Sequence, residues 1–341
     1  MTMRNLMPST VRQKYFRLTS ACMATVMSAV LFASPMVAQA KDAYPSRPIK
    51  IILGFSAGGG TDAIARTLAR HMAATLGGSV VVDNKPGANG NIAADEAARA
   101  SADGYTLLYN TSAIASSPAL YGKRLSYDVS TAFTPVSRTA SLPIILVVPE
   151  KSPFKTVEAL VAHAKQHPGE LNYASAGNGN VTHLAALTFE DAVSIKGTHI
   201  PYKGEAQAIV DLMAGMVDYY FATSAGAIPG VKSGRLRALA VASIKPLDTL
   251  PGVPTLDATV AKGTDLAAWS GLLAPVGTPP EVIDKLNDAV TKALADGEVQ
   301  SFFATQSAQA TPSTPEEYGI FLNKEITSLA KVIKAAGLSL D

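Results

Sequence analysis

The sequence predicts an α/β fold of two lobes, with one lobe contributed by each half of the chain. Short apolar runs typical of strands alternate with helical patterns almost throughout, as in α/β proteins with largely parallel sheets. Two strand-to-helix turns with the pattern Ser-Ala-Gly-x-Gly lie 119 residues apart, at 56–60 and 175–179. One such turn in each half suggests two lobes that hold one ligand between them.

Each expected strand is a short apolar run that ends near glycine, proline or a polar residue. The strands are expected at 49–55, 80–83, 105–110, 144–148, 171–175, 199–201, 217–221, 236–242 and 270–275. Amphipathic helices are predicted over 62–76 and 156–167, where apolar residues recur every three or four positions. Two capping-box spacings, Thr278 with Glu281 and Thr314 with Glu317, predict two later helices.

The first 40 residues have the pattern of a secretory signal peptide. Residues 18–37 are mostly apolar, and Ala38-Gln39-Ala40 fits a cleavage site. Polar residues and Pro35 interrupt the apolar run, which disfavours a transmembrane anchor. The positive segment before the run holds Arg4, Arg12, Lys14 and Arg17. We therefore expect export to the periplasm, cleavage after Ala40 and no stable membrane insertion.

The charge and the cysteine content of the remaining chain bear on its partners and on its stability. The full sequence has 29 basic and 27 acidic residues, and four of the basic ones but none of the acidic ones fall within residues 1–40. The mature chain would thus carry a net charge near −2, which gives no reason to expect nucleic acid or an anionic membrane as partner. The single cysteine, Cys22, also lies in the signal, so packing alone must stabilise the mature protein.

The two glycine-rich turns suit an anionic ligand. A strand-to-helix turn points unpaired backbone N–H groups, at the positive end of a helix dipole, towards whatever lies in front of it. Gly58-Gly59-Gly60 lacks the lysine of a phosphate loop, and neither turn has complete dinucleotide-binding spacing. The alternative is that the glycines serve only tight connections. The recurrence of the turn with Ser, Thr and Asn favours ligand contact, and no cofactor is expected.

Gly54-Phe55-Ser56-Ala57-Gly58 matches the G-x-S-x-G pattern of a hydrolase nucleophile elbow. Such an elbow normally follows several strands, whereas this one ends the first strand expected in the mature chain. No oxyanion segment precedes it and no histidine is marked as its base. We therefore expect no catalysis, and a serine hydrolase using Ser56 is kept as an alternative.

The histidines do not predict a metal site. His163 and His167 are four residues apart on a predicted helix, a spacing compatible with a metal, but no third ligand is apparent. Both lie on the polar face, so solvated side chains are expected there. His183 and His199 are expected to be structural. For the lone tryptophan, Trp269, core packing is favoured over a place at the hinge or in the lining of the cleft.

Several blocks in order along the chain resemble one family. They are 44–49 with 54–62, 84–90, 103–108, 172–183, 199–204, 236–243 and 269–279. Together they resemble the periplasmic solute-binding proteins of tripartite tricarboxylate transporters, also called Bug receptors. The resemblance implies a type II-like periplasmic-binding-protein fold, in which each lobe is a mixed sheet flanked by helices and the ligand cleft lies between the lobes. Residues 41–143 with 265–341 would form one lobe, and 144–264 the other.

The resemblance also implies which residues contact the ligand. The two turns would form a carboxylate cradle in each lobe, and polar residues after two other strands would face the cleft. The residues so expected are Phe55, Ser56, Ala57, Gly60, Thr61, Asp62, Thr111, Ser112, Ser175, Ala176, Asn178, Gly179 and Thr223. Neither cradle contains Arg or Lys, so neutral donors and helix ends would hold the carboxylate.

The function implied is that of a monomeric receptor that captures a small organic carboxylate and delivers it to cognate membrane transporter subunits. No metal is expected. A sensory receptor that presents the ligand to a signalling partner stays open as an alternative, because the fold does not separate transport from sensing.

Overall fold

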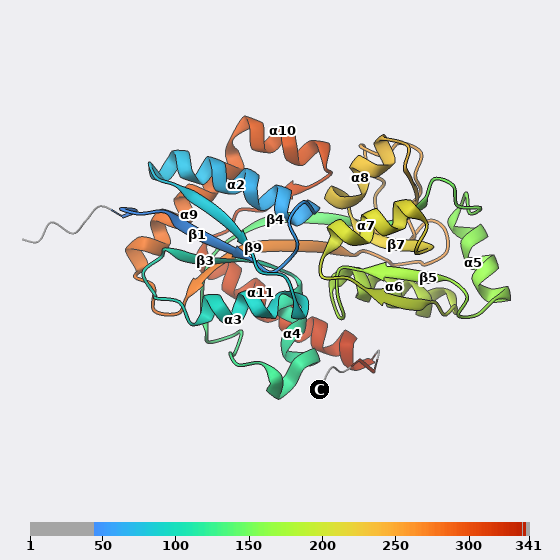
Figure 1. Ribbon diagram of the computed structural model, residues 1–341, viewed down its shortest axis with the longest axis horizontal. Coiled ribbons are helices and arrows are strands. Elements are labelled where there is room, and N and C mark those ends of the chain that lie inside the picture. The colour runs from blue at the N-terminus through green and yellow to red at the C-terminus, as the bar shows by residue number, and fades with distance from the viewer. Residues whose placement is uncertain (1–43, 336, 339–341) are drawn as a thin grey trace, which may run out of the picture. The chain divides into compact units, whose positions relative to one another are not determined.

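The computed structural model describes residues 44–335 and 337–338. The predicted signal peptide, residues 1–40, lies outside the described residues. Within them, no helix is long and apolar enough to span a membrane. Two groups of strands, joined through one long strand, organise the fold (Figure 1).

The first sheet has the strand order β2-β1-β3-β9-β4, with β10 added to β4. β1 pairs in parallel with β2 and β3, whereas β9 lies antiparallel between β3 and β4. All but one of the residues of β1 are buried, because helices cover both faces of the sheet. The strands are β1 (Ile49–Leu53), β2 (Val80–Asn84), β3 (Thr106–Thr111), β4 (Phe133–Pro149), β9 (Ala267–Pro275) and β10 (Gln309–Ala310).

The second sheet is built on the later half of β4. β7 and β8 each pair antiparallel with that half, and β5 joins β7 to β6 through parallel pairs. Tyr220 and Ala222 on β7 are fully buried in an apolar cluster formed by residues between 145 and 250, so this sheet has an apolar core of its own. Its other strands are β5 (Asn172–Ser175), β6 (Thr198–Pro201), β7 (Tyr219–Thr223) and β8 (Leu236–Val241).

Helices pack on both sheets (Figure 1). Those associated with the first sheet are α2 (Gly60–Leu76), α3 (Asn91–Ala98), α4 (Ala113–Tyr121), α9 (Pro280–Ala295), α10 (Gly297–Thr305) and α11 (Pro315–Ala335), with short 3-10 turns at Ala88–Gly90 and Gly122–Arg124. Those associated with the second are α5 (Val157–Gln166), α6 (Val181–Val193), α7 (Glu205–Ala214) and α8 (Ser224–Lys232).

Strand β4 joins the two sheets. It pairs with β9 as far as Pro143 and with β7 from Ile144 onwards. We call the part of the molecule around the first sheet the first lobe, and the part around the second sheet the second lobe. The boundaries 143/144 and 264/265 stay predictions, and the change of pairing partner within β4 supports the first of them.

The predicted α/β architecture with mixed sheets is confirmed, and local errors concern β4 and one helix start. The sequence predicts only 144–148 as a strand, whereas β4 begins at Phe133, in a polar and proline-containing stretch that reads poorly as strand. The Thr314–Glu317 capping box forms, since Glu317 N–H donates to Thr314 Oγ1 at 3.1 Å and Thr314 N–H donates to Glu317 Oε2 at 2.9 Å. The helix predicted from Thr278 and Glu281 is present as α9, but Pro279 is the residue before it and the Thr278 hydroxyl donates to Pro275 O instead of capping the helix.

Candidate ligand-binding site

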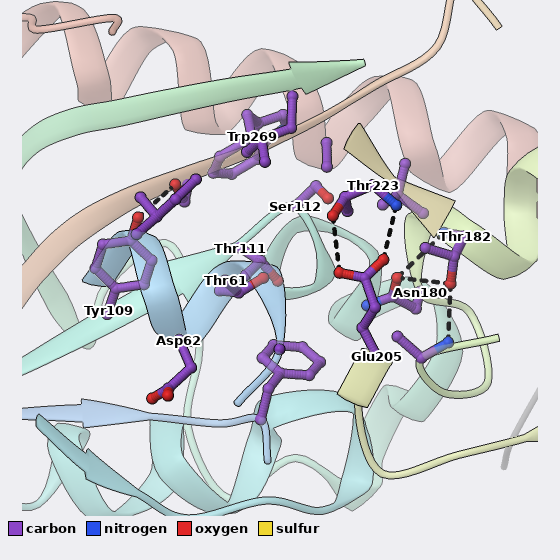
Figure 2. A pocket seen from close by; sticks show the side chains of 18 of the residues that line it. Thr61, Asp62, Tyr109, Thr111, Ser112, Asn180, Thr182, Glu205, Thr223 and Trp269 are labelled. Atoms are coloured by element: carbon purple, nitrogen blue, oxygen red, sulfur yellow. Dashed lines mark hydrogen bonds between the residues drawn. The ribbon is translucent and has the colours of Figure 1, made fainter. Parts of the chain in front are cut away.

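A pocket between the lobes lies at the carboxyl ends of strands β1, β3 and β7, where α/β folds commonly bind ligands (Figure 2). It contains about 570 Å³ of space not filled by protein atoms, part of which is open to solvent. The lining residues are Phe55, Ser56, Gly59, Thr61, Asp62, Ile64, Tyr109, Thr111, Ser112, Leu142, Ala176, Asn180, Val181, Thr182, Glu205, Thr223, Ala268, Trp269 and Ser270.

Five helices begin at or beside this pocket. Each first residue follows or is itself a lining residue, so five positive dipole ends lie around one space. The helices are α2, α4, α6, α7 and α8, which start at Gly60, Ala113, Val181, Glu205 and Ser224. No Lys, Arg or His is among the residues that line the pocket, so the helix ends are the sources of positive charge that the lining offers to an anion.

Two lining side chains cap their own helices. Asn180 Oδ1 accepts from Thr182 N at 3.1 Å at the start of α6. Thr223 Oγ1 accepts from Gly226 N at 3.2 Å at the start of α8. These caps fix the entry of each helix but use only some of the first-turn N–H groups.

Asp62 organises the first glycine-rich turn. Its carboxylate accepts from Gly58 N at 2.9 Å, from Arg66 Nε at 2.9 Å and from Asn84 Nδ2 at 3.0 Å. Burial alone would raise the pKa of Asp62, but these hydrogen bonds and the nearby Arg66 charge outweigh it and lower the pKa. In Figure 2 this carboxylate points away from Thr61, Thr111 and Glu205. The negative charge of Asp62 is therefore balanced outside the pocket.

Glu205 supplies the second carboxylate of the lining. One oxygen accepts from Thr223 N at 2.7 Å, and the other accepts from Thr223 Oγ1 at 2.8 Å (Figure 2). The backbone N–H of Gly60, at the start of α2, also favours the charged form of this carboxyl group and so lowers its pKa. Burial raises the pKa of Glu205 to about 7 despite these hydrogen bonds, because no cation lies beside it among the lining residues.

The other polar groups of the pocket differ in whether they have a hydrogen-bond partner. Tyr109 Oη and Ser270 Oγ are 2.8 Å apart, and Trp269 Nε1 donates to Glu325 Oε2 at 2.8 Å. In contrast, the hydroxyl of Ser112, only 4% exposed, has no hydrogen-bond partner among the residues that the structure describes. A buried unpaired hydroxyl is costly unless a ligand or water completes it. Ser112 is thus a candidate ligand donor.

The two lobes touch across the pocket. Ser56 Oγ donates to Lys203 O at 3.2 Å, and Asn180 Nδ2 donates to Asn89 Oδ1 at 3.2 Å. A Cβ added at Gly60 would lie 2.8 Å from the backbone of Ala225, so α2 and α8 approach with their N-termini facing each other. Glycine permits this approach, since any other side chain would push the helices apart.

The structure brings eight of the thirteen predicted site residues into the pocket lining. They are Phe55, Ser56, Thr61, Asp62, Thr111, Ser112, Ala176 and Thr223. Five others do not line it. Ala57 is exposed, and Gly60 contacts α8 instead. Asn178 lines a separate hollow beside Tyr121 and Tyr202, and Gly179 packs against Leu120.

Ser175, the fifth, is fully buried behind the second turn. Its hydroxyl lies 2.6 Å from His199 Nε2, donates to Gly177 O at 3.1 Å and accepts from Gly177 N at the same distance. These contacts leave its hydroxyl fully used within the protein. Ser175 therefore shapes the turn, and the proposal that it contacts ligand directly loses its support.

Sequence reasoning missed several lining residues, above all Glu205 and Thr182. Thr182 follows the second turn directly, so the helix-capping pattern Asn-x-Thr that begins at Asn180 could have identified it. Glu205 begins a helix after Lys203-Gly204, and an acidic residue in a first helical turn is too ordinary to single out. Its contribution depends on where α7 and α8 meet, which only the structure shows.

His163 and His167 are joined by a residue that the sequence does not indicate. His163 Nε2 lies 3.4 Å from Glu170 Oε1, and His167 Nδ1 lies 3.3 Å from Glu170 Oε2. The ligand atoms of the three residues are within 4.8 Å of one another. A third potential metal ligand is therefore present, contrary to the expectation, but all three side chains are at least partly exposed and none lines the pocket.

Known proteins share this fold. The family described as the tripartite tricarboxylate transporter family receptor matches residues 64–338. BugT from Bordetella pertussis is 36% identical over 303 residues, covering 88% of this chain and 92% of BugT. The solved structure of the periplasmic binding protein BugD has a TM-score of 0.84 at 34% identity, with 86% of this chain and 99% of that one covered. An R. palustris protein solved with adipate has a TM-score of 0.84 at 32% identity, covering 87% and 100% of the two chains.

The fold and the pocket between the lobes define a two-lobed solute-binding protein of the periplasmic type. The chain belongs to the tripartite tricarboxylate transporter receptor family, as its resemblance to the Bug receptors predicts.

Proposed function

We propose that this protein is a periplasmic receptor that captures a small organic carboxylate in the pocket between its lobes and delivers it to a tripartite tricarboxylate-type membrane transporter. The observation that carries the proposal is the convergence of five helix N-termini on a pocket with no cationic side chain. Such ends bind carboxylates through backbone N–H groups. The related protein solved with adipate supports a carboxylate as ligand.

Neutral donors suffice for the affinity that a transport receptor needs. Hydrogen bonds to a charged group contribute about 1.5–3 kcal/mol each, and micromolar binding needs about 8 kcal/mol. Around four such bonds, less the cost of association, reach this range. The unpaired hydroxyl of Ser112 and the hydroxyls of Thr61 and Thr111 are suitable candidates beside the helix ends.

A hydrolase that uses Ser56 is disfavoured by the contact its hydroxyl makes. Ser56 Oγ donates to the carbonyl of Lys203 at 3.2 Å, whereas a nucleophile needs a base that accepts its proton. Stoichiometric labelling of Ser56 by a serine-directed phosphonate would reopen this alternative.

Ligand binding can be tested with Trp269, the single tryptophan of the chain, because it lines the pocket. Protein freed of endogenous ligand by unfolding and refolding is titrated with a panel of organic acids, followed by tryptophan fluorescence and calorimetry. We expect saturable, one-to-one binding by at least one acid and none by matched neutral amides. Uptake of that acid by cells should require this gene together with the membrane subunits. Absence of binding by every acid would refute the proposal.

A further inference from the structure

The side chain of Glu205 fills one of the anion positions of the pocket. Its two oxygens accept hydrogen bonds from the N–H and the hydroxyl of Thr223 at the start of α8, and the backbone N–H of Gly60 at the start of α2 favours its charged form. A Cβ at Gly226 would lie 2.2 Å from Glu205 Cδ, so the carboxyl group is held directly against the first turn of α8. The protein's own carboxylate thus occupies donors that a ligand carboxylate would otherwise use.

No cation in the lining offsets this carboxylate. Among the residues that line the pocket, the ionisable ones are Asp62, Tyr109 and Glu205. Asp62 is paired with Arg66, and the hydroxyl of Tyr109 is bonded to Ser270. Tyr220, behind the pocket, offers only a long contact of 3.5 Å to Glu205. Glu205 is therefore the unbalanced negative group that an incoming ligand meets.

The donors left for a ligand carboxylate lie elsewhere in the pocket. Ser112 is 96% buried with an unpaired hydroxyl at the start of α4, and Thr111 and Thr61 line the same space (Figure 2). A ligand carboxylate bound by these donors would share the pocket with Glu205, which also lines it.

We infer that Glu205 determines specificity: the ligand carries one carboxylate, and its other end presents N–H or O–H donors rather than a second carboxylate to Glu205. The inference rests on the proposed function, because it assumes that a carboxylate ligand enters this pocket. The physical reason is that two like charges in a pocket shielded from water repel strongly, whereas an ammonium, amide or hydroxyl group is attracted to a buried carboxylate.

The test compares ligands that differ only in one end. Calorimetry measures the affinity of a dicarboxylate, its half-amide and the corresponding ω-amino acid. The set of three is repeated for several lengths of the ligand's carbon chain. The solution is held at a pH well above the pKa of Glu205, so that the carboxyl group is charged. For wild-type protein we expect the half-amide or the amino acid to bind about ten-fold or more tightly than the dicarboxylate of the same length, a difference of about 1.4 kcal/mol.

The variant Glu205→Gln removes the charge and keeps the shape. Its amide oxygen can still accept from Thr223 N, and its amide group can donate to Thr223 Oγ1. We expect the preference against the dicarboxylate to fall at least several-fold. The control Glu158→Gln makes the same change on an exposed position of α5 and should leave the preference unaltered.

Each outcome decides the inference. A wild-type protein that binds dicarboxylates as tightly as the half-amides refutes it and leaves the proposed function standing. A preference that Glu205→Gln does not alter refutes the assignment to Glu205. If no acid of any series binds, the proposed function fails and the inference with it.

A measurement on wild-type protein covers the case in which the variant does not fold. As the pH is lowered through the pKa of Glu205, the affinity for the dicarboxylate should rise relative to the affinity for the half-amide of the same length. If the ratio of these two affinities stays constant across that pH range, the inference is refuted.

Discussion

The imidazole rings of His183 and His199 lie stacked behind the second glycine-rich turn, with 3.8 Å between their centroids and 7° between their planes. His183 Nδ1 accepts from Gly179 N at 3.0 Å, which requires this nitrogen to be unprotonated. Burial lowers the pKa of His183 to about 3, with the neighbouring His199 adding to the effect, and burial lowers that of His199 to about 4. Two neutral histidines therefore support the turn.

The stability of the fold should depend on pH through this pair. Both histidines charge near pH 6.5 when unfolded but stay neutral in the fold until about pH 4. The unfolded state thus binds more protons in this range, so the free energy of unfolding falls as the pH falls, by up to about 1.4 kcal/mol per pH unit for each histidine.

Buried carboxyl groups act in the opposite direction. Burial raises the pKa of Glu205 to about 7 and raises that of Glu190, so their contribution is present at low pH and is lost as the pH rises through the folded-state pKa. Double substitution with His183→Asn and His199→Gln keeps an acceptor near Gly179 and a hydrogen-bonding amide near Ser175 while removing the titration. Urea unfolding at several pH values gives the free energy of unfolding of each protein. The value for wild type minus the value for the variant should become smaller as the pH is lowered from 6.5 to 4. A constant difference would contradict the prediction.

Replacing Ser112 separates binding from folding. Its hydroxyl is buried and unpaired in the structure, so Ser112→Ala removes no hydrogen bond from the free protein. We expect unchanged or slightly higher thermal stability. The loss of one buried donor to a carboxylate should weaken ligand binding by about 1–3 kcal/mol, measured by calorimetry. Ser175→Ala should instead lower stability, because that hydroxyl bonds within the protein. If Ser112→Ala and Ser175→Ala change affinity and stability by equal amounts, the prediction is wrong.

Arg66 should matter more to stability than an ordinary surface arginine. Its Nε bonds both oxygens of the buried Asp62, and its guanidinium also bonds Asn84. Arg66→Ala leaves Asp62 without its cation, at an expected cost of about 1–3 kcal/mol. Arg99 makes the same i, i+4 pair with the more exposed Asp95, and Arg99→Ala should cost less than about 1 kcal/mol. Urea unfolding of the two variants checks the difference, and similar losses would show that burial of the pair is unimportant.

The sequence reveals most of the fold because periodicity and glycine turns are local signals. The turn at 56–60 and its helix are predicted from a buried strand followed by glycines, and the structure places Phe55, Ser56 and Thr61 in the pocket. Ser175 has the same position in its own turn, yet it points to His199. A shared local sequence pattern determines the course of the backbone. The direction of each side chain depends on residues that are distant in sequence.

Glu205 and the early half of β4 mark the limit of that reasoning. β4 between Phe133 and Pro143 holds prolines and polar residues, and it is a strand because β9 pairs with it. Glu205 joins the pocket because α7 and α8 begin side by side, with Thr223 opposite its carboxylate. Both features depend on contacts between segments distant in sequence, which composition and spacing do not encode.

The contact between Gly60 and Ala225 should control closure of the lobes. Gly60 begins α2 in the first lobe, and a Cβ there would lie 2.8 Å from the Ala225 backbone and 2.8 Å from Gly226 N in the second lobe. Gly60→Ala should therefore disfavour the arrangement seen here, in which the lobes touch, and favour a more open one. Because the ligand contacts both lobes only when they are close, its affinity should fall as the closed population falls.

The expected loss is about 1–3 kcal/mol, the usual cost of overpacking, or roughly five- to a hundred-fold in affinity. Thermal stability of the ligand-free protein should change little, since each lobe keeps its own core. Gly297→Ala is the matched control: Gly297 is also the first residue of a helix, α10, and a Cβ there meets nothing within 4 Å. Small-angle scattering with and without ligand should show that ligand compacts wild-type and Gly297→Ala protein more than Gly60→Ala protein. Equal affinity and equal compaction in all three would show that the approach of α2 to α8 does not limit closure.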